Sequence, residues 1–211
     1  MVLEGSEGSV QVAYFVHNLN DAAVAKRVLM LKAAGMRVTL LGFRRQSQAI
    51  CESPDVEIVE LGKTADAKLI ARAACVALNM ARAPIWAAKA AGADIIISRN
   101  LETLVLAAIA KQLSAPRARL IYECLDIHRL MLRTDLLGRC LRGLERQLLA
   151  RSDGLIVSSP AFVTHYFKAN QAAVLPAVAL VENKILRLSG EVSPPLLQEP
   201  PGPPWRIGWF G

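Results

Sequence analysis

Short apolar runs recur along the chain, and polar or turn-forming residues follow each of them. Most of these runs are apolar at consecutive positions, which predicts strands that are buried on both faces. The run at 56–61 instead alternates apolar and polar residues, which predicts a strand near a sheet edge. The predicted strands are 10–16, 37–43, 56–61, 94–98, 119–124 and 154–159.

Between these runs, apolar residues recur three or four positions apart, as in helices that pack along one side. We expect Asn18, Asn20 and Asp21 to form the turn and N-cap before the first helix, and Gly35 to end it. The long stretch 65–91 should be interrupted at Pro84, because proline lacks the amide donor of a helix interior. The predicted helices are 22–34, 65–91, 101–113, 135–151 and 160–168, followed by a short apolar segment at 172–176.

The alternation of strands and helices predicts an α/β fold, namely a Rossmann-like, doubly wound, mostly parallel sheet with helices on both faces. Residues 1–188 would form this domain. Residues 189–204 are rich in proline and are expected to form an extended linker. Residues 205–211 read like the first strand of a second domain that is cut short.

The composition allows a full core and suggests an anionic partner. Apolar residues make up 53% of the 211 residues, and the formal net charge is +7. That charge suits a nucleotide sugar, a lipid phosphate, an acidic membrane or nucleic acid, although a basic solvated surface is an equal alternative. Aromatic residues are only 5% and are not interleaved with basic ones, which disfavours binding of single-stranded nucleic acid.

The cysteines and the N-terminus favour the cytoplasm. Cys51, Cys75, Cys124 and Cys140 are widely spaced and form no CxxC pair, so we expect reduced, structural thiols. The N-terminal residues lack the basic and apolar regions of a secretory signal, and no apolar run is long enough to span a bilayer. We therefore expect a cytoplasmic protein, with peripheral contact at the inner face of the membrane as an alternative.

The loop after the first strand reads VHNLND and contains no glycine. A dinucleotide site would need G-x-G-x-x-G here, so an NAD- or FAD-dependent enzyme, including a nucleotide-sugar epimerase, is disfavoured. No P-loop and no G-x-S-x-G motif occurs either. Asn18 and Asn20 could bind a polar ligand, but simple helix capping by Asn20 or Asp21 is the stronger reading.

Two later strands carry polar residues at the carboxyl ends, where ligands bind in open parallel sheets. Arg99 and Asn100 follow one strand, and an arginine there could clamp phosphate or carboxylate or form an internal ion pair. Glu123, Asp126 and His128 lie around the end of the next strand, where they could bind hydroxyls or transfer a proton. The alternative is that Asp126 caps a turn and His128 packs. The spacing gives a metal site little support.

Two further features are open to bland readings. Ser158 precedes Ser159 and Pro160 at the start of a helix, whose amides could hold an anion, although an ordinary serine N-cap is more common. The helix 135–151 is basic on one side and leucine-rich on the other. It could touch an anionic membrane, but packing of the leucines on the sheet is the preferred reading. Those leucines are Leu137, Leu141, Leu144 and Leu148.

The order and spacing of several segments resemble the N-terminal half of a GT-B-fold glycosyltransferase of the family 4 type. The matching segments are 20–45, which begins NDAAVAKRVL, 94–101 (DIIISRNL), 121–128 (IYECLDIH), 144–159 (LERQLLARSDGLIVSS) and 181–184 (VENK). In that family two Rossmann-like domains face each other across a cleft, and Ile207–Gly211 looks like the first strand of the second domain.

The resemblance implies transfer of a sugar, with retention, from a nucleotide-sugar donor to an acceptor in glycan or polysaccharide biosynthesis. It implies no metal and no cofactor beyond the nucleotide-sugar co-substrate. The second domain would supply most donor contacts, so this chain alone is expected to be inactive. The acceptor would be a glycan or lipid-linked molecule bound by this half, and nucleic acid is not expected as a partner.

By position, the resemblance makes Asp126 and His128 the candidate catalytic residues. Glu145 and Ser158 match family positions, with a structural role equally open. Two departures concern ligand contacts, because many members have a glycine-rich loop after the first strand and others have histidine at Arg99. The expected substrate-binding residues are Asn18, Asn20, Asp21, Arg99, Asn100, Glu123 and Ser158. A non-catalytic α/β module that binds a ligand or partner is the alternative to an enzyme.

Overall fold

The computed structural model describes residues 8–45, 56–64 and 79–184. Seven strands form one sheet in the order β3-β2-β1-β4-β5-β6-β7, and every neighbouring pair is parallel. The strand order reverses between β1 and β4, which is the switch point of a doubly wound sheet. The strands are β1 (Gln11–Val16), β2 (Arg37–Arg45), β3 (Glu57–Thr64), β4 (Ile95–Arg99), β5 (Arg119–Cys124), β6 (Gly154–Val157) and β7 (Ala177–Leu180).

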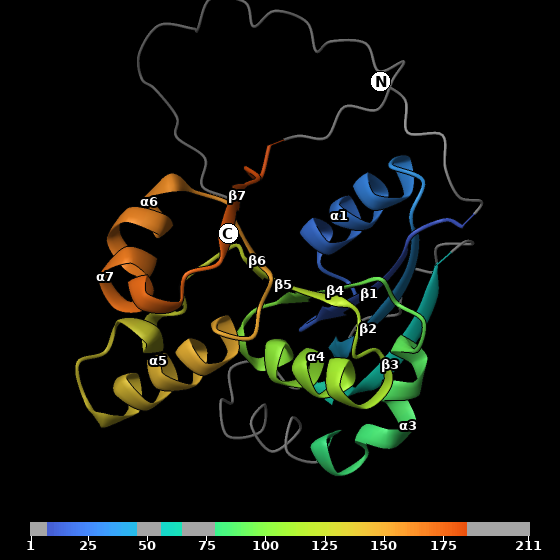
Figure 1. Ribbon diagram of the computed structural model, residues 1–211, viewed down its shortest axis with the longest axis horizontal. Helices are drawn as coiled ribbons and strands as arrows, with labels where there is room; N and C mark the ends of the chain where they lie inside the picture. Colours follow the sequence, from blue (N-terminus) through green and yellow to red (C-terminus); the bar gives the residue numbers. More distant parts are fainter. Residues whose placement is uncertain (1–7, 46–55, 65–78, 185–211) are drawn as a thin grey trace, which may run out of the picture.

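Helices cover both faces of the sheet, as Figure 1 shows with α1 on one side and α3 and α4 on the other. The helix α1 is capped by Asp21, whose side chain accepts a hydrogen bond from the Ala23 amide, and it is closed by Gly35 at φ 77°. The longer elements are α1 (Ala22–Ala33), α3 (Ala83–Ala87), α4 (Leu101–Ser114) and α5 (Leu136–Leu149), and the shorter ones are η1 (Ala88–Ala90), η2 (Arg129–Leu132), α6 (Pro160–Phe162), η3 (Val163–Phe167), α7 (Lys168–Gln171) and η4 (Ala172–Val174).

Two hydrophobic clusters correspond to the two faces. Under α1, Val24 and Val28 pack against Tyr14 and Ile97. The larger cluster joins the opposite face of the sheet to α3, α4, α5 and η3, and its buried members include Trp86 and Phe167. The predicted α/β fold with a doubly wound parallel sheet is therefore confirmed, and β3 lies at a sheet edge as expected.

Several predicted elements need correction. The stretch 79–91 contains the short α3 and η1 rather than one helix, and Pro84 lies in the first turn of α3, where its missing amide is tolerated. The expected helix at 160–168 is split into α6, the π-helical η3 and α7. The strand β7 was not predicted, because its four residues are all exposed and show no alternation.

The leucine face of α5 is covered less than expected. Leu148 is buried and Leu141 packs against the core, but Leu137 and Leu144 are 43% and 38% exposed. The reading in which all four leucines pack on the sheet is therefore wrong for the outer two, because they lie outside the strip that contacts the core. Leu136, in the first turn, is 68% exposed as well.

Some predictions concern segments outside the described residues. These are the linker 189–204, the strand at 205–211 and most of the helix over 65–78. Cys51 and Cys75 also lie there. Within the described part, Cys124 is a buried free thiol and Cys140 an exposed one.

Candidate functional site

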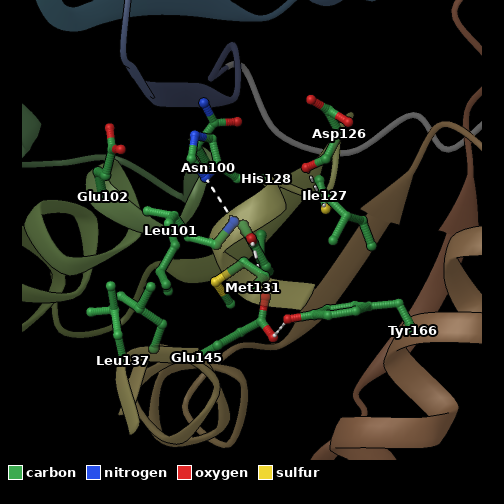
Figure 2. A pocket seen from close by; sticks show the side chains of 14 residues that line it. Asn100, Leu101, Glu102, Asp126, Ile127, His128, Met131, Leu137, Glu145 and Tyr166 are labelled. Atoms are coloured by element: carbon green, nitrogen blue, oxygen red, sulfur yellow. Dashed lines mark hydrogen bonds between the residues drawn. The ribbon is translucent and has the colours of Figure 1, made fainter. Parts of the chain in front are cut away.

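A cavity of about 320 Å³ lies at the carboxyl ends of β4 and β5. Its walls are mostly apolar side chains from α4, η2 and α5, while polar side chains surround its mouth and its floor (Figure 2). Its size falls in the range of about 300–1,000 Å³ that is usual for small-molecule sites. The lining residues are Asn100, Leu101, Glu102, Tyr122, Cys124, Asp126, Ile127, His128, Leu130, Met131, Leu137, Leu141, Glu145 and Tyr166.

Asn100 has an unusual backbone conformation at the edge of this cavity. Its φ of 74° and ψ of 157° lie in a region that is normally confined to glycine. Its amide donates a hydrogen bond to the Glu123 carbonyl over 3.3 Å, which ties the end of β4 to β5. Within the described part of the chain, its side chain makes no capping bond to α4. Strained residues of this kind concentrate at ligand sites, so the conformation supports a role for Asn100.

His128 and Asp126 lie at the mouth of the cavity and are exposed. The Nδ1 atom of His128 accepts a hydrogen bond of 3.3 Å from the Leu130 amide, and His128 thereby caps η2. In this neutral form the proton resides on Nε2, which can donate to a ligand. The alternative in which His128 packs and Asp126 caps is wrong, because the histidine is exposed and is itself the cap.

The floor of the cavity holds a buried acid, Glu145. Tyr166 Oη and Gln171 Nε2 each donate a hydrogen bond of 2.7 Å to its Oε2 atom, and Tyr122 Oη lies 3.4 Å from Oε1. Burial raises the pKa of Glu145 above its ordinary value despite these bonds. Burial also raises the pKa of the nearby Cys124 thiol to about 12. The acid connects α5 with η3 and α7, a structural role that the sequence analysis had left open.

Glycine shapes the wall that α5 contributes. A Cβ atom at Gly138 would come within 2.2 Å of the Arg133 carbonyl oxygen. The first turn of α5 can therefore lie directly against the segment that follows η2. Asp135 caps the same turn by accepting a 3.1 Å hydrogen bond from the Gly138 amide. The Arg133 guanidinium bound to Asp135 lowers the pKa of that carboxyl to about 2.

Glu123 lies in a different place from its sequence neighbours Asp126 and His128. It is completely buried under α1 and accepts hydrogen bonds from the Tyr14 hydroxyl and from Arg27. Both Nε and Nη2 of Arg27 lie 2.7 Å from Oε1 of Glu123. Burial and the adjacent Glu123 raise the pKa of Tyr14 well above its ordinary value.

Arg99 lines a second cavity, of about 140 Å³, on the α1 side of the sheet. It is only 2% exposed, and its Nη1 atom has no hydrogen-bond partner among the described residues. The nearest acid, Asp21, lies 4.0 Å away. The other lining residues are Ala23, Lys26, Arg27, Met30, Leu125, Val181, Glu182, Asn183 and Lys184.

The remaining predicted residues have structural partners. Asn18 is buried, and its side-chain oxygen accepts a 3.1 Å hydrogen bond from the Asn20 amide. Asp21 caps α1 through a 2.8 Å bond from the Ala23 amide. Ser158 donates a 2.9 Å hydrogen bond to the Leu125 carbonyl, which joins the ends of β5 and β6, while the N-cap of α6 is Ser159. These four side chains line neither cavity.

The structure thus separates the candidates into groups. It brings Asn100, Asp126 and His128 to one cavity and places Arg99 in another. Sequence reasoning missed Tyr122 and Tyr166 on the first cavity, which gave no signal beyond ordinary core aromatics. It also missed Arg27, although that arginine falls on the apolar stripe of its helix beside Val24 and Val28.

Two searches concern the described residues alone. No helix among them is both long and apolar enough to cross a membrane. In the same ranges, no three side chains of histidine, cysteine, aspartate or glutamate lie together in a way that could hold a metal ion.

Comparisons with known proteins agree with this fold. The chain is 43% identical over 206 residues to the succinoglycan biosynthesis protein ExoL of Rhizobium meliloti strain 1021, and the match covers 96% of this chain and 51% of that protein. The chain therefore spans about half the length of this curated relative. No family model matches the chain.

Two solved structures share the architecture. Sucrose-phosphate synthase from Thermosynechococcus elongatus superimposes with a TM-score of 0.53 at 14% identity, over 82% of this chain and 48% of that one. Glycyrrhiza uralensis UGT73P12, complexed with glycyrrhetinic acid 3-O-monoglucuronide, gives a TM-score of 0.55 at 8% identity, over 83% and 49%. Each matches over about half its length, so the fold is that of one Rossmann-like half of a GT-B glycosyltransferase, as the sequence resemblance implied.

Proposed function

We propose that the chain forms the acceptor-side half of a glycosyltransferase of polysaccharide biosynthesis. The observation that carries the proposal is the cavity at the carboxyl ends of β4 and β5, with Asn100, Asp126 and His128 at its mouth. The similarity to a succinoglycan biosynthesis protein and the GT-B-like architecture support it. The donor would be a nucleotide sugar, held largely by a second domain, and the product would retain the anomeric configuration.

The geometry suggests a division of labour at the cavity. The exposed Asp126 carboxylate can accept a hydrogen bond from an acceptor hydroxyl, and His128 Nε2 can donate one. The Asn100 amide can bind a second hydroxyl from the β4 side. Leu101, Met131 and Leu137 would contact the apolar part of the acceptor. The proposal needs no metal and no cofactor.

We also propose that the enzyme works in the cytoplasm and contacts the inner face of the membrane. The motivation is the exposure of Leu136 and Leu137 on α5, whose other side carries arginines. Exposed leucines beside basic side chains suit an interface with anionic lipid, where a lipid-linked acceptor would lie. Binding of the full-length protein to vesicles of anionic phospholipid, lost when Leu136 and Leu137 are changed to serine, would support this part.

The test of catalysis uses the full-length protein with both domains. Replacing His128 with alanine should lower turnover at least tenfold, because general acid–base or hydroxyl-orienting groups contribute about 10²–10⁴ to rates. His165→Ala is the matched control, since His165 is exposed and lines neither cavity. Unchanged turnover in His128→Ala would remove the proposed role. NMR of the glycosidic linkage against the donor's anomeric configuration tests retention.

A non-catalytic binding module would behave differently in the same assays. It would bind a sugar or nucleotide sugar without releasing the nucleotide. Full-length protein that binds such ligands and never transfers the sugar to an acceptor extract would therefore contradict the proposed activity.

A further inference from the structure

The cavity around Arg99 carries more positive charge than its surroundings neutralise. Four basic residues line it, namely Lys26, Arg27, Arg99 and Lys184, against one acid, Glu182. Even when Asp21 and Glu123 behind the cavity are added to Glu182, the basic groups outnumber the acids four to three. A buried charge is costly to keep without a partner, so the arrangement favours an anionic ligand.

Arg99 is the group that lacks a partner most clearly. It is 2% exposed, and Nη1 makes no hydrogen bond to any described residue. Glu123 sits opposite Arg99 on the neighbouring strand, yet its carboxylate is taken by Arg27 and Tyr14. Asp21 is engaged by the amide of Ala23 and remains 4.0 Å from Arg99. One guanidinium edge is therefore left to face the cavity.

The other basic residues differ in how free they are. Lys26 hydrogen-bonds Asn183 and, over 2.8 Å, the carbonyl of Lys184, which holds the segment after β7 against α1. Lys184 pairs with Glu182 at the rim. Arg99 would thus bind the anion directly, while Lys26 and Lys184 would add positive potential at the mouth.

The size of the cavity limits the ligand. Its volume of about 140 Å³ exceeds the share of one water molecule, about 30 Å³, several times over. It is well below the roughly 300 Å³ at which pockets for whole small molecules begin. The space suits one phosphoryl group, whose oxygens match the planar donors of a guanidinium.

We propose that the Arg99 cavity is a phosphoryl-binding site, separate from the cavity at His128. The two sites lie on opposite faces of the sheet, because Arg99 and Asn100 are consecutive residues whose side chains line different cavities. The site does not require transferase activity, so this inference goes beyond the proposed function. The phosphoryl group is either free phosphate or the end of a larger substrate.

The test is titration of the full-length protein with inorganic phosphate by isothermal calorimetry. We expect saturable binding of one phosphate per chain, weakened at least tenfold by Arg99→Gln. Arg139→Gln removes the same charge from the exposed side of α5 and should leave the affinity unchanged. Equal affinity of wild type and Arg99→Gln would overturn the assignment, as would acetate binding as tightly as phosphate.

A second variant makes the test independent of any folding defect in Arg99→Gln. Asp21→Asn keeps a good helix N-cap but removes the acid that competes for Arg99. It should bind phosphate at least threefold more tightly than wild type, and no gain would contradict the proposal. Competition then separates the sources: displacement of phosphate by uridine diphosphate or a prenyl phosphate identifies a substrate's phosphoryl group, and coexistence identifies a free anion. Loss of transfer in His128→Ala with phosphate binding intact would leave this inference standing.

Discussion

Two buried glutamates on opposite faces of the sheet form a natural comparison. Glu123, under α1, is held by Arg27 and Tyr14 and pairs charge with charge. Glu145, under the cavity at His128, is held by Tyr166 and Gln171, which are neutral donors. The same side chain is thus built into an ion pair on one face and into a hydrogen-bond network on the other. Hydrogen bonds alone do not offset the loss of water around Glu145, so burial raises the pKa of this carboxyl.

The largest difference should appear when each glutamate is removed. Glu123→Ala leaves Arg27 and Arg99 buried with no acid between them, and we expect the free energy of unfolding to fall by about 3–5 kcal/mol. Glu145→Ala leaves only neutral donors unsatisfied, which should cost about 1–3 kcal/mol. Urea unfolding of both variants measures the difference. If Glu145→Ala cost as much as Glu123→Ala, the contrast between the two faces would be lost.

Changing the tyrosines sharpens the same contrast at lower cost. Tyr14→Phe removes a hydrogen bond to a charged acid and should lower the free energy of unfolding by about 1.5–3 kcal/mol. Tyr166→Phe removes a bond to an acid that burial shifts toward its neutral form, for which about 0.5–1.5 kcal/mol is expected. Tyr122→Phe is the internal control, because its 3.4 Å contact with Glu145 is long and its loss should cost least. A reversed order of the first two would show that Glu145 carries the stronger charge.

The smallest effect is a change in how stability depends on pH. The pKa of Glu145 is raised above its model value of 4.5, so the folded protein holds the proton more tightly than the unfolded chain does. The stability from this group is therefore fully present below pH 4.5 and declines as the pH rises through the raised value. Glu145→Gln cannot lose a proton. The stability of wild type relative to Glu145→Gln should decrease from pH 4.5 upward, in urea unfolding at a series of pH values. A wild-type advantage that grows with pH would contradict the assignment.

Much of the fold could be predicted because it rests on local patterns. The apolar run of β1, the alternation of β3 and the cap at Asp21 each reflect a physical preference within a few residues. The strand β7 could not be predicted in this way. It forms because its backbone pairs with β6, while its side chains stay exposed and carry no pattern.

The candidate site was predicted in part. The rule that ligands bind at the carboxyl ends of strands located Asn100, Asp126 and His128, and the structure brings these three to one cavity. Glu123 was grouped with them because it is close in sequence. Alternation along β5 instead turns its side chain to the face opposite Tyr122 and Cys124, so proximity along the chain was misleading.

The sequence by itself determined the α/β class, the order of most elements and the edge of the sheet at which polar residues gather, because these depend on periodicity and capping within short windows. The tertiary structure alone decided which residues share a cavity. The positive φ of Asn100 divides it from Arg99, and the packing of α1 assigns Glu123 to Arg27 rather than to Arg99. Such choices depend on contacts between strands and helices far apart in the chain, and no local pattern encodes them.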